Sequence, residues 1–176
     1  MDGMVFRQAL GAFATGVAVI TARGPDGAPI GMTMSSFNSV SIDPPLVLFS
    51  VDRRAYSLPA MEQARGFAVN ILARDQEAIS NRFARALGDK WSDIDRTPGH
   101  AEAPLIAGAL AHFECEPYAR HDGGDHVIFL VRVLRHAVHA GRPAPLIFFR
   151  GRYCDLLDGS AHPSQDQSRS TTTSAV

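Results

Sequence analysis

The N-terminal residues repeat apolar positions at helical spacing and then change period. Phe6, Leu10 and Phe13 lie three or four residues apart, which predicts a short amphipathic helix over residues 4–13. Residues 15–21 form a run rich in β-branched side chains that suits a buried strand. The chain therefore begins with a helix and continues into β-structure.

The rest of the chain alternates strand-like apolar runs with turn residues. Gly24–Gly27 and Pro44–Pro45 separate the first runs, and further helices are predicted over residues 57–66 and from a capping Asp75 to about residue 86. Residues 87–103 are rich in Gly, Asp and Pro and are expected to form a loop. The predicted strands cover residues 15–21, 28–34, 46–51, 67–72, 107–118, 126–139 (after a turn over 121–125) and 146–150, the last one extended through 156.

Six or more strands joined by hairpins, with few helices, predict a mainly β fold closed as an antiparallel barrel. The 176 residues suffice for one domain, and 45% hydrophobic with 20% charged residues is typical of a soluble globular protein. After residue 157 the sequence turns to Ser, Thr, Gln and Pro without apolar periodicity. Residues 1–157 are therefore predicted to form the domain, and residues 158–176 a disordered tail.

The charge and the cysteines exclude several classes of function. A net charge of −1 without a basic patch argues against a nucleic-acid partner. No apolar run approaches the ~20 residues that span a bilayer, and the N-terminus lacks a secretion signal, so we expect a cytoplasmic protein without membrane contact. Cys115 and Cys154 are too few for a disulfide framework or a four-ligand zinc site, and the acids flanking Cys115 disfavour a reactive thiolate. No metal site is predicted.

Four polar segments are candidates for binding or catalysis, and each has a plain structural alternative. Gly31–Ser39 gathers hydroxyl and amide groups that can bond a phosphate or a heteroaromatic edge without net charge, or form a serine-rich turn. Ser50–Ser57 carries two arginines and fits either an anion site or a solvated basic loop. Gly124–His126 places a histidine at the start of a strand, where it fits either a contact to a substrate or an ordinary surface turn. Phe149–Tyr153 suits a phosphate and a base, or a β-bulge with extended arginines.

The common nucleotide-binding motifs are absent from the sequence. It contains no Gly-x-x-x-x-Gly-Lys-Ser/Thr and no Gly-x-Gly-x-x-Gly after a strand. It also lacks the Gly-x-Ser-x-Gly of a serine hydrolase. A nucleotide, if one binds, must be held by other means.

The order of the segments is more specific than any one of them, and it resembles the short-chain flavin reductase family. These proteins are the reductase components of two-component flavin monooxygenases. The resemblance spans about residues 4–156. It is carried by Phe6–Val17, Met32–Phe37, Ser39–Ser41, Pro44–Val47, Phe67–Leu72, Gly108–Ala111, Gly124–His126 and Arg150–Tyr153.

The resemblance implies an antiparallel FMN-binding split barrel of Greek-key-like topology, usually a homodimer with flavin near the subunit interface. It implies an enzyme that oxidises NADH or NADPH, reduces FMN or FAD, and supplies reduced flavin to a separate monooxygenase. NADH is favoured over NADPH because no Arg/Lys cluster for a 2′-phosphate is visible. The alternatives are a flavin-binding electron carrier or storage protein without rapid NADH turnover, and an oxidase with a split barrel.

The same resemblance implies three sets of site residues. The isoalloxazine ring would be contacted, partly through backbone, by Met32, Thr33, Met34, Ser35 and Ser36. The ribityl and phosphate side would be lined by Ser50, Val51, Asp52, Arg53 and Ser57, with Phe83 at the adenylate or phosphate end. The nicotinamide nucleotide would meet His126, Arg150, Gly151 and Tyr153.

Hydride transfer fits a site without an obvious acid or base. The reaction requires the two rings to stack at roughly 3 to 3.5 Å, so the protein supplies orientation and neutral hydrogen bonds while the cofactor carries the chemistry. His126 would act as the catalytic residue by orienting the nicotinamide carboxamide. Tyr56 stands where the family commonly has a small residue, and it either stacks on an adenine or narrows the pocket against FAD, which leaves FMN or FAD open.

Overall fold

The computed structural model describes residues 2–141 and 144–156, so the tail predicted over 158–176 lies outside the described residues. Within this part the protein is mainly β with a few short helices, as the hydrophobic pattern predicts. The helices are α1 (Gly3–Leu10), α2 (Leu58–Glu62) and α3 (Glu77–Phe83). The strands are β1 (Thr15–Gly16), β2 (Ala18–Arg23), β3 (Pro29–Met34), β4 (Asn38–Ile42), β5 (Pro45–Asp52), β6 (Phe67–Ile71), β7 (Arg96–Pro98), β8 (Pro104–Ile106), β9 (Ala111–Gly123), β10 (His126–Val138), β11 (Ile147–Phe149) and β12 (Arg152–Cys154).

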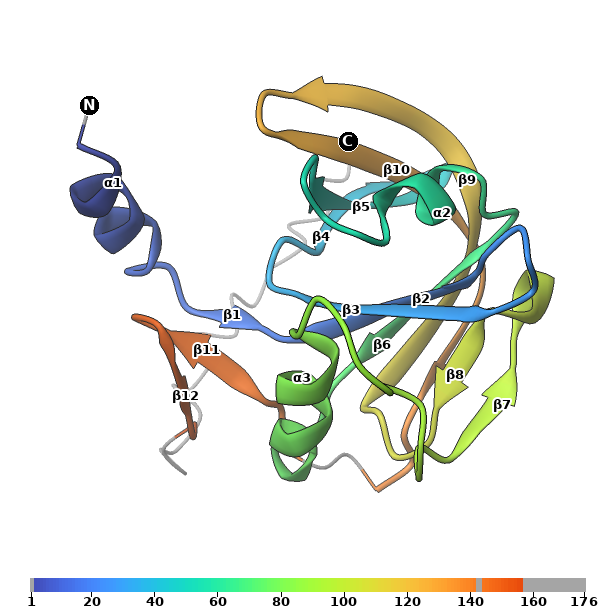
Figure 1. The fold of residues 1–176 in the computed structure, drawn as a ribbon. Helices are drawn as coiled ribbons and strands as arrows, with labels where there is room; N and C mark the ends of the chain where they lie inside the picture. Colours follow the sequence, from blue (N-terminus) through green and yellow to red (C-terminus); the bar gives the residue numbers. More distant parts are fainter. Residues whose placement is uncertain (1, 142–143, 157–176) are drawn as a thin grey trace, which may run out of the picture.

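Seven strands form one antiparallel sheet in the order β3-β2-β6-β9-β10-β5-β4. Figure 1 shows β9 and β10 as a long curved ribbon that arches over the body, with α3 beside β3 and β2. Two small sheets, β1-β11-β12 and β7-β8, complete the described part. The hairpins expected from turn residues therefore assemble into a strongly curved sheet.

The core holds three packed phenylalanine rings, one from each of β5, β6 and β10, among aliphatic side chains. Phe49 of β5 lies directly opposite Phe129 of β10, and their stacked ring centroids are 5.2 Å apart. Phe67 of β6 packs edge-on against both rings. Because burying one such side chain contributes roughly 1.5–3 kcal/mol, this cluster fixes the register of β5 against β10. That register also determines where the polar ends of the two strands lie.

The helices differ from the sequence predictions at their ends. α1 stops at Leu10 instead of residue 13, and α2 ends at Glu62, four residues before the predicted end. Asp75 does not cap α3, because it lies within a preceding 3-10 turn over Arg74–Gln76. The side chain of Gln76 accepts the backbone N–H of Ala73 there, which closes that turn without Asp75.

Several strands also differ from the predictions. β4 was not predicted, and β7 with a 3-10 turn over His100–Glu102 occupies the segment expected to be a loop. β9 starts at Ala111 and continues to Gly123, so the expected five-residue turn is reduced to Gly124 and Asp125.

The last predicted strand is in fact a hairpin. β11 and β12 pair antiparallel, and the two residues between them, Arg150 and Gly151, have φ angles of 49° and 78°. Two consecutive positive φ angles are the geometry of a tight two-residue hairpin turn, in which glycine is favoured. A continuous extended strand through residue 156 is therefore wrong.

Helix α1 stands away from the curved sheet in Figure 1, and none of its residues is buried. Phe6, Leu10 and the following Phe13 are 49%, 59% and 77% exposed. The helix and the Arg150–Gly151 turn together border a groove of about 850 Å³, mostly apolar in lining. The amphipathic face that the sequence shows thus has no partner within the described part of the chain. None of the helices there is long and apolar enough to cross a membrane.

Candidate functional site

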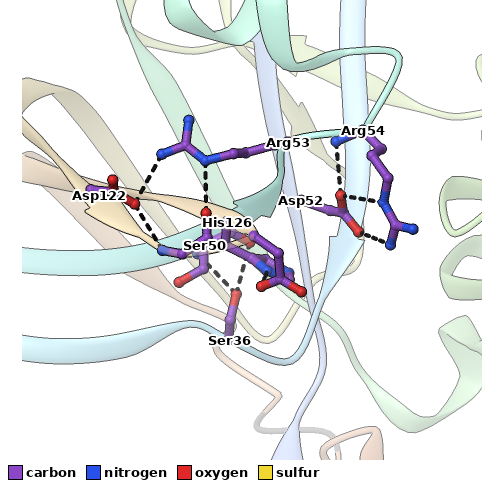
Figure 2. Close-up of polar contacts among 9 residues, drawn as sticks. Ser36, Ser50, Asp52, Arg53, Arg54, Asp122 and His126 are labelled. Carbon is purple, nitrogen blue, oxygen red and sulfur yellow. Dashed lines mark hydrogen bonds and ion pairs between the residues drawn. The ribbon is translucent and has the colours of Figure 1, made fainter. Parts of the chain in front are cut away.

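Ser36 and Ser50 join two segments that the sequence assigns to different parts of a ligand. The backbone N–H of Ser50 donates to Ser36 Oγ at 3.0 Å, and that hydroxyl can donate to the Ser50 carbonyl at 3.3 Å (Figure 2). Ser36 follows β3, whereas Ser50 lies near the end of β5. Ser35 and Ser36 are both exposed, and the Ser36 hydroxyl is engaged by the Ser50 backbone while it lies at the surface.

Arg53 follows β5 and is bound by the turn between β9 and β10. Its Nε donates to the Gly124 carbonyl at 2.8 Å, and its terminal nitrogen lies 3.0 Å from Asp122 Oδ1 (Figure 2). Its backbone N–H also donates to the carbonyl of Asp125 at 2.9 Å. The Gly124 N–H and the Arg53 guanidinium together lower the pKa of Asp122. Arg53 therefore fastens the turn to β5, and a neighbouring carboxylate neutralises its charge.

Arg54 is paired in the same way with Asp52. The carboxylate of Asp52 accepts the Arg54 backbone N–H at 2.8 Å and two guanidinium bonds at 3.1 and 2.8 Å. These hydrogen bonds hold the pKa of Asp52 well below its usual range. Both arginines of the predicted anion site thus have carboxylate partners within the chain.

His126 is the first residue of β10 and stands opposite Asp52 in the β5–β10 register. Its Nδ1 lies 2.7 Å from Asp125 Oδ1, and this hydrogen bond lowers the pKa of Asp125. The side chain is 40% exposed, and Nε2 has no hydrogen-bond partner among residues 2–141 and 144–156. Asp125 therefore fixes the orientation of the ring, and the other ring nitrogen is open to a ligand.

Thr33 and Tyr153, predicted to meet different rings, are joined through Ser80 of α3. Thr33 Oγ1 donates to the Ser80 carbonyl at 2.7 Å, and Ser80 Oγ lies 2.8 Å from Tyr153 Oη. The tyrosine hydroxyl also donates to Asn81 Oδ1 at 3.1 Å. These bonds hold β3, α3 and β12 together, and they occupy the polar atom of Tyr153 with scaffold contacts.

Three of the predicted site side chains lie in the core. Met34, Val51 and Phe83 are 7%, 1% and 1% exposed. Phe83 packs edge-on against Trp91 with ring centroids 4.8 Å apart, so its side chain is a core contact rather than part of a ligand-facing surface. Because their side chains are buried, Met34 and Val51 can contact a ligand only through their backbone groups. The remaining Met32 is partly buried on β3.

Arg150 and Gly151 lie at the hairpin turn between β11 and β12, which borders the α1 groove. The guanidinium of Arg150 stands 5.0 Å from the centroid of the Phe149 ring, a cation–π arrangement. The structure therefore does not bring these two residues into the hydrogen-bonded group that contains His126.

A second groove of about 270 Å³ contains a basic residue that the motifs did not reveal. Its lining includes Tyr56, Ser57, Lys90 and Trp91. Ser57 makes no capping hydrogen bond with its side chain to α2. Lys90 is the only lysine among the 17 basic residues of the sequence. A lone lysine among arginines was the sequence signal that could have identified it as a candidate binding residue.

The remaining candidates for chemistry are the buried cysteine and possible metal ligands. Cys115 is fully buried, and burial raises the pKa of its thiol to about 12, so a thiolate nucleophile is disfavoured as predicted. No group of three His, Cys, Asp or Glu side chains in the described part of the chain is arranged to hold a metal ion. The arrangement offers neutral hydroxyls, backbone groups and one oriented imidazole.

Comparison with known proteins identifies the family. Residues 10–157 match the flavin reductase like domain. The chain is 49% identical over 138 residues to the FMN reductase (NADH) SmoA of Agrobacterium fabrum, with 78% of each chain covered. It is 40% identical over 165 residues to HsaB of Mycobacterium tuberculosis, the reductase subunit of a flavin-dependent monooxygenase, covering 93% of this chain and 88% of the relative.

A solved structure gives the same result for the fold. It is the NADH:FAD oxidoreductase SgcE6 of Streptomyces globisporus C-1027, determined in complex with NAD and FAD fragments. The match has a TM-score of 0.85 at 37% identity, and it covers 91% of this chain and 96% of the other. The protein therefore belongs to the family of flavin reductase-like domains, as the order of its sequence motifs implied.

Proposed function

We propose that the protein is an NADH-dependent flavin reductase that reduces FMN or FAD and supplies reduced flavin to a separate monooxygenase. The observation that carries this proposal is the match over residues 10–157 to the flavin reductase like domain. The similarity to an NADH-dependent FMN reductase and to a monooxygenase reductase subunit, each over more than two thirds of both chains, supports the reaction and the partner.

The donors in the candidate site suit a flavin. Ser35 and Ser36 present hydroxyls where β3 and β5 end, next to backbone groups of the same segments. Uncharged donors of this kind can bond the polar edge of an isoalloxazine ring and stabilise the negative charge that grows there on reduction. We assign the ring contacts to Met32, Thr33, Met34, Ser35 and Ser36 and the ribityl side to Ser50, Val51, Asp52, Arg53 and Ser57.

When bound, the flavin accepts a hydride from NADH, and the protein acts by positioning. His126 is suited to hold the nicotinamide carboxamide through Nε2, because Asp125 already fixes the other ring nitrogen. Arg53 supports this arrangement indirectly by fastening the turn that precedes His126. Arg150 and Gly151 remain candidates for the nicotinamide nucleotide from the α1 side, and Tyr153 anchors their hairpin.

We further propose that two copies of the chain associate as a homodimer of split barrels. The observation in support is the exposed apolar face of α1 beside a groove of about 850 Å³. Large apolar surface left open on a single chain marks an association site. Sedimentation equilibrium is expected to give twice the chain mass, and Phe6→Ser with Leu10→Ser should shift the protein towards monomer. A wild-type monomer at micromolar concentration would contradict the proposal.

The test of the reaction is steady-state oxidation of NADH and NADPH with FMN, FAD and riboflavin in parallel. We expect turnover with NADH and free flavin, and slower turnover with NADPH. Stoichiometric binding of flavin without turnover would instead support the alternative of an electron carrier or storage protein. Addition of a flavin-dependent monooxygenase to the reduced flavin then tests the proposed transfer.

A further inference from the structure

The single lysine of the sequence is half-buried in the groove of about 270 Å³. Its ammonium donates to two backbone carbonyls, those of Gly31 at 3.2 Å and Phe83 at 3.4 Å. No carboxylate in the described part of the chain comes within 4 Å of it. Burial lowers the pKa of Lys90, because no carboxylate offsets the loss of water around its ammonium. A half-buried cation without a counter-ion favours an anionic ligand.

One carboxylate, Asp26, lines the same groove but serves another purpose. It accepts the backbone N–H of Ala28 at 3.0 Å and so closes the turn between β2 and β3. It does not form an ion pair with Lys90, and it therefore leaves the ammonium available to a ligand.

The other cations expected to bind an anion are already occupied. Arg53 is bound by Asp122 and the Gly124 carbonyl, and Arg54 is paired with Asp52. Recruiting either arginine for a phosphate would require breaking a charge-assisted hydrogen bond within the protein. Lys90 requires no such exchange with a carboxylate.

The groove is also continuous with the segments assigned to the flavin. Gly31, whose carbonyl Lys90 contacts, immediately precedes Met32, the first of the proposed ring contacts. Ser57, assigned to the ribityl and phosphate side, lines the same groove, and its hydroxyl does not cap α2. A ring held along β3 would lie next to this groove, where an ammonium and a hydroxyl together suit a phosphate ester.

We propose that Lys90 is the cation that binds the phosphate ester common to FMN and FAD, and thereby distinguishes these two flavins from riboflavin. This inference rests on the proposed flavin reductase function and names the group in that site which recognises the phosphate. The adenosine part of FAD is not needed for this contact.

The first test measures flavin dissociation constants by quenching of flavin fluorescence, without NADH. Lys90→Met is expected to weaken FMN and FAD about tenfold or more, as for loss of a charge-assisted hydrogen bond, and to leave riboflavin unchanged. Lys90→Arg should retain most of the affinity. Arg65→Met, which removes an exposed cation elsewhere, is the matched control and should change none of the three.

The second test uses the unaltered protein, since Lys90→Met also removes bonds to two carbonyls and could disturb the fold. An amine-acetylating reagent is applied, and mass spectrometry follows modification of the one lysine-containing peptide. FMN is expected to protect Lys90, whereas riboflavin at equal saturation and NADH are not.

Four results would overturn the inference: equal weakening of FMN and riboflavin, no weakening, weakening of FAD alone, or protection by NADH instead of FMN. Failure of the proposed function is a separate result, namely no NADH oxidation by the unaltered protein with any flavin. The binding and protection measurements decide the role of Lys90 in either case.

Discussion

Gly31 is the position where one added methyl group should disturb the fold and the site together. A Cβ at this position would stand 2.5 Å from Phe83 Cδ1, closer still to Cε1, and 3.2 Å from Trp91 Cζ2. Ordinary van der Waals contact begins near 3.4 Å, so the Phe83 ring would have to retreat by about 0.9 Å. That ring is 1% exposed and packs against Trp91, whose Nε1 donates to the Pro29 carbonyl at 2.9 Å.

Overpacking of this kind typically costs about 1–3 kcal/mol, because side chains leave their rotamers or the backbone shifts. We therefore expect Gly31→Ala to lower the free energy of unfolding by about 1–3 kcal/mol, measured by urea denaturation. Gly16→Ala is the matched control, since a Cβ there meets nothing within 4 Å, and it should be neutral or slightly stabilising.

A compensating change tests the cause. If the clash is with the Phe83 ring, adding Phe83→Leu to Gly31→Ala should cost less than the sum of the two single changes. Additive losses, or a Gly31→Ala protein as stable as the Gly16→Ala control, would refute the steric argument. Because the Gly31 and Phe83 carbonyls both bind Lys90, the Gly31→Ala protein should also bind FMN more weakly than wild type.

Three further predictions follow from single groups. His126→Ala should raise the KM for NADH about tenfold and lower kcat less, and stopped-flow hydride transfer showing the reverse would exclude a positioning role. At pH 8 iodoacetamide should modify Cys154 well before Cys115, whose thiol is buried with a pKa of about 12; equal rates would contradict that burial. Arg135 lowers the pKa of Glu114, so the ionised carboxylate stabilises the native state above the unfolded pKa near 4.3 and loses this effect as pH falls. Glu114→Gln should therefore cost about 1 kcal/mol at pH 7 and progressively less as the pH falls below the unfolded pKa, and a loss that does not change with pH would reject the ion pair.

The strands that the sequence revealed are those in which burial and composition agree. β2 is a β-branched run with five buried residues, and β10 alternates buried and less buried positions over its first half. β4 was missed because Asn38–Ile42 is mostly exposed and rich in serine, with Ile42 91% exposed. It is held by pairing with β5, and pairing with a distant strand leaves little trace in a local pattern.

A local sequence pattern also fails to show which distant residues each site residue contacts. The motifs placed Arg53 and His126 in separate candidate segments, and the structure brings these segments together because β5 and β10 pair at their ends. They could not show that Arg53 is bound by Asp122, which lies 69 positions away in the sequence. They also could not show that Phe83 is in the core, because its burial depends on Gly31 and Trp91 from separate segments.

The distribution of charge explains how a site rich in arginine can present neutral donors. Arg53 and Arg54 each have an aspartate partner within 3.0 Å, so their charges are satisfied by the protein itself, and Asp125 holds the His126 ring through Nδ1. The hydroxyls of Ser35 and Ser36 lie between β3 and β4, beside the end of β5, and carry no charge. In the proposed flavin site, a redox ring that changes its charge during the reaction would meet dipoles rather than a fixed ion. In the same proposal, Lys90 in the adjoining groove lined by Ser57 would add affinity through the phosphate without placing a fixed charge at the ring.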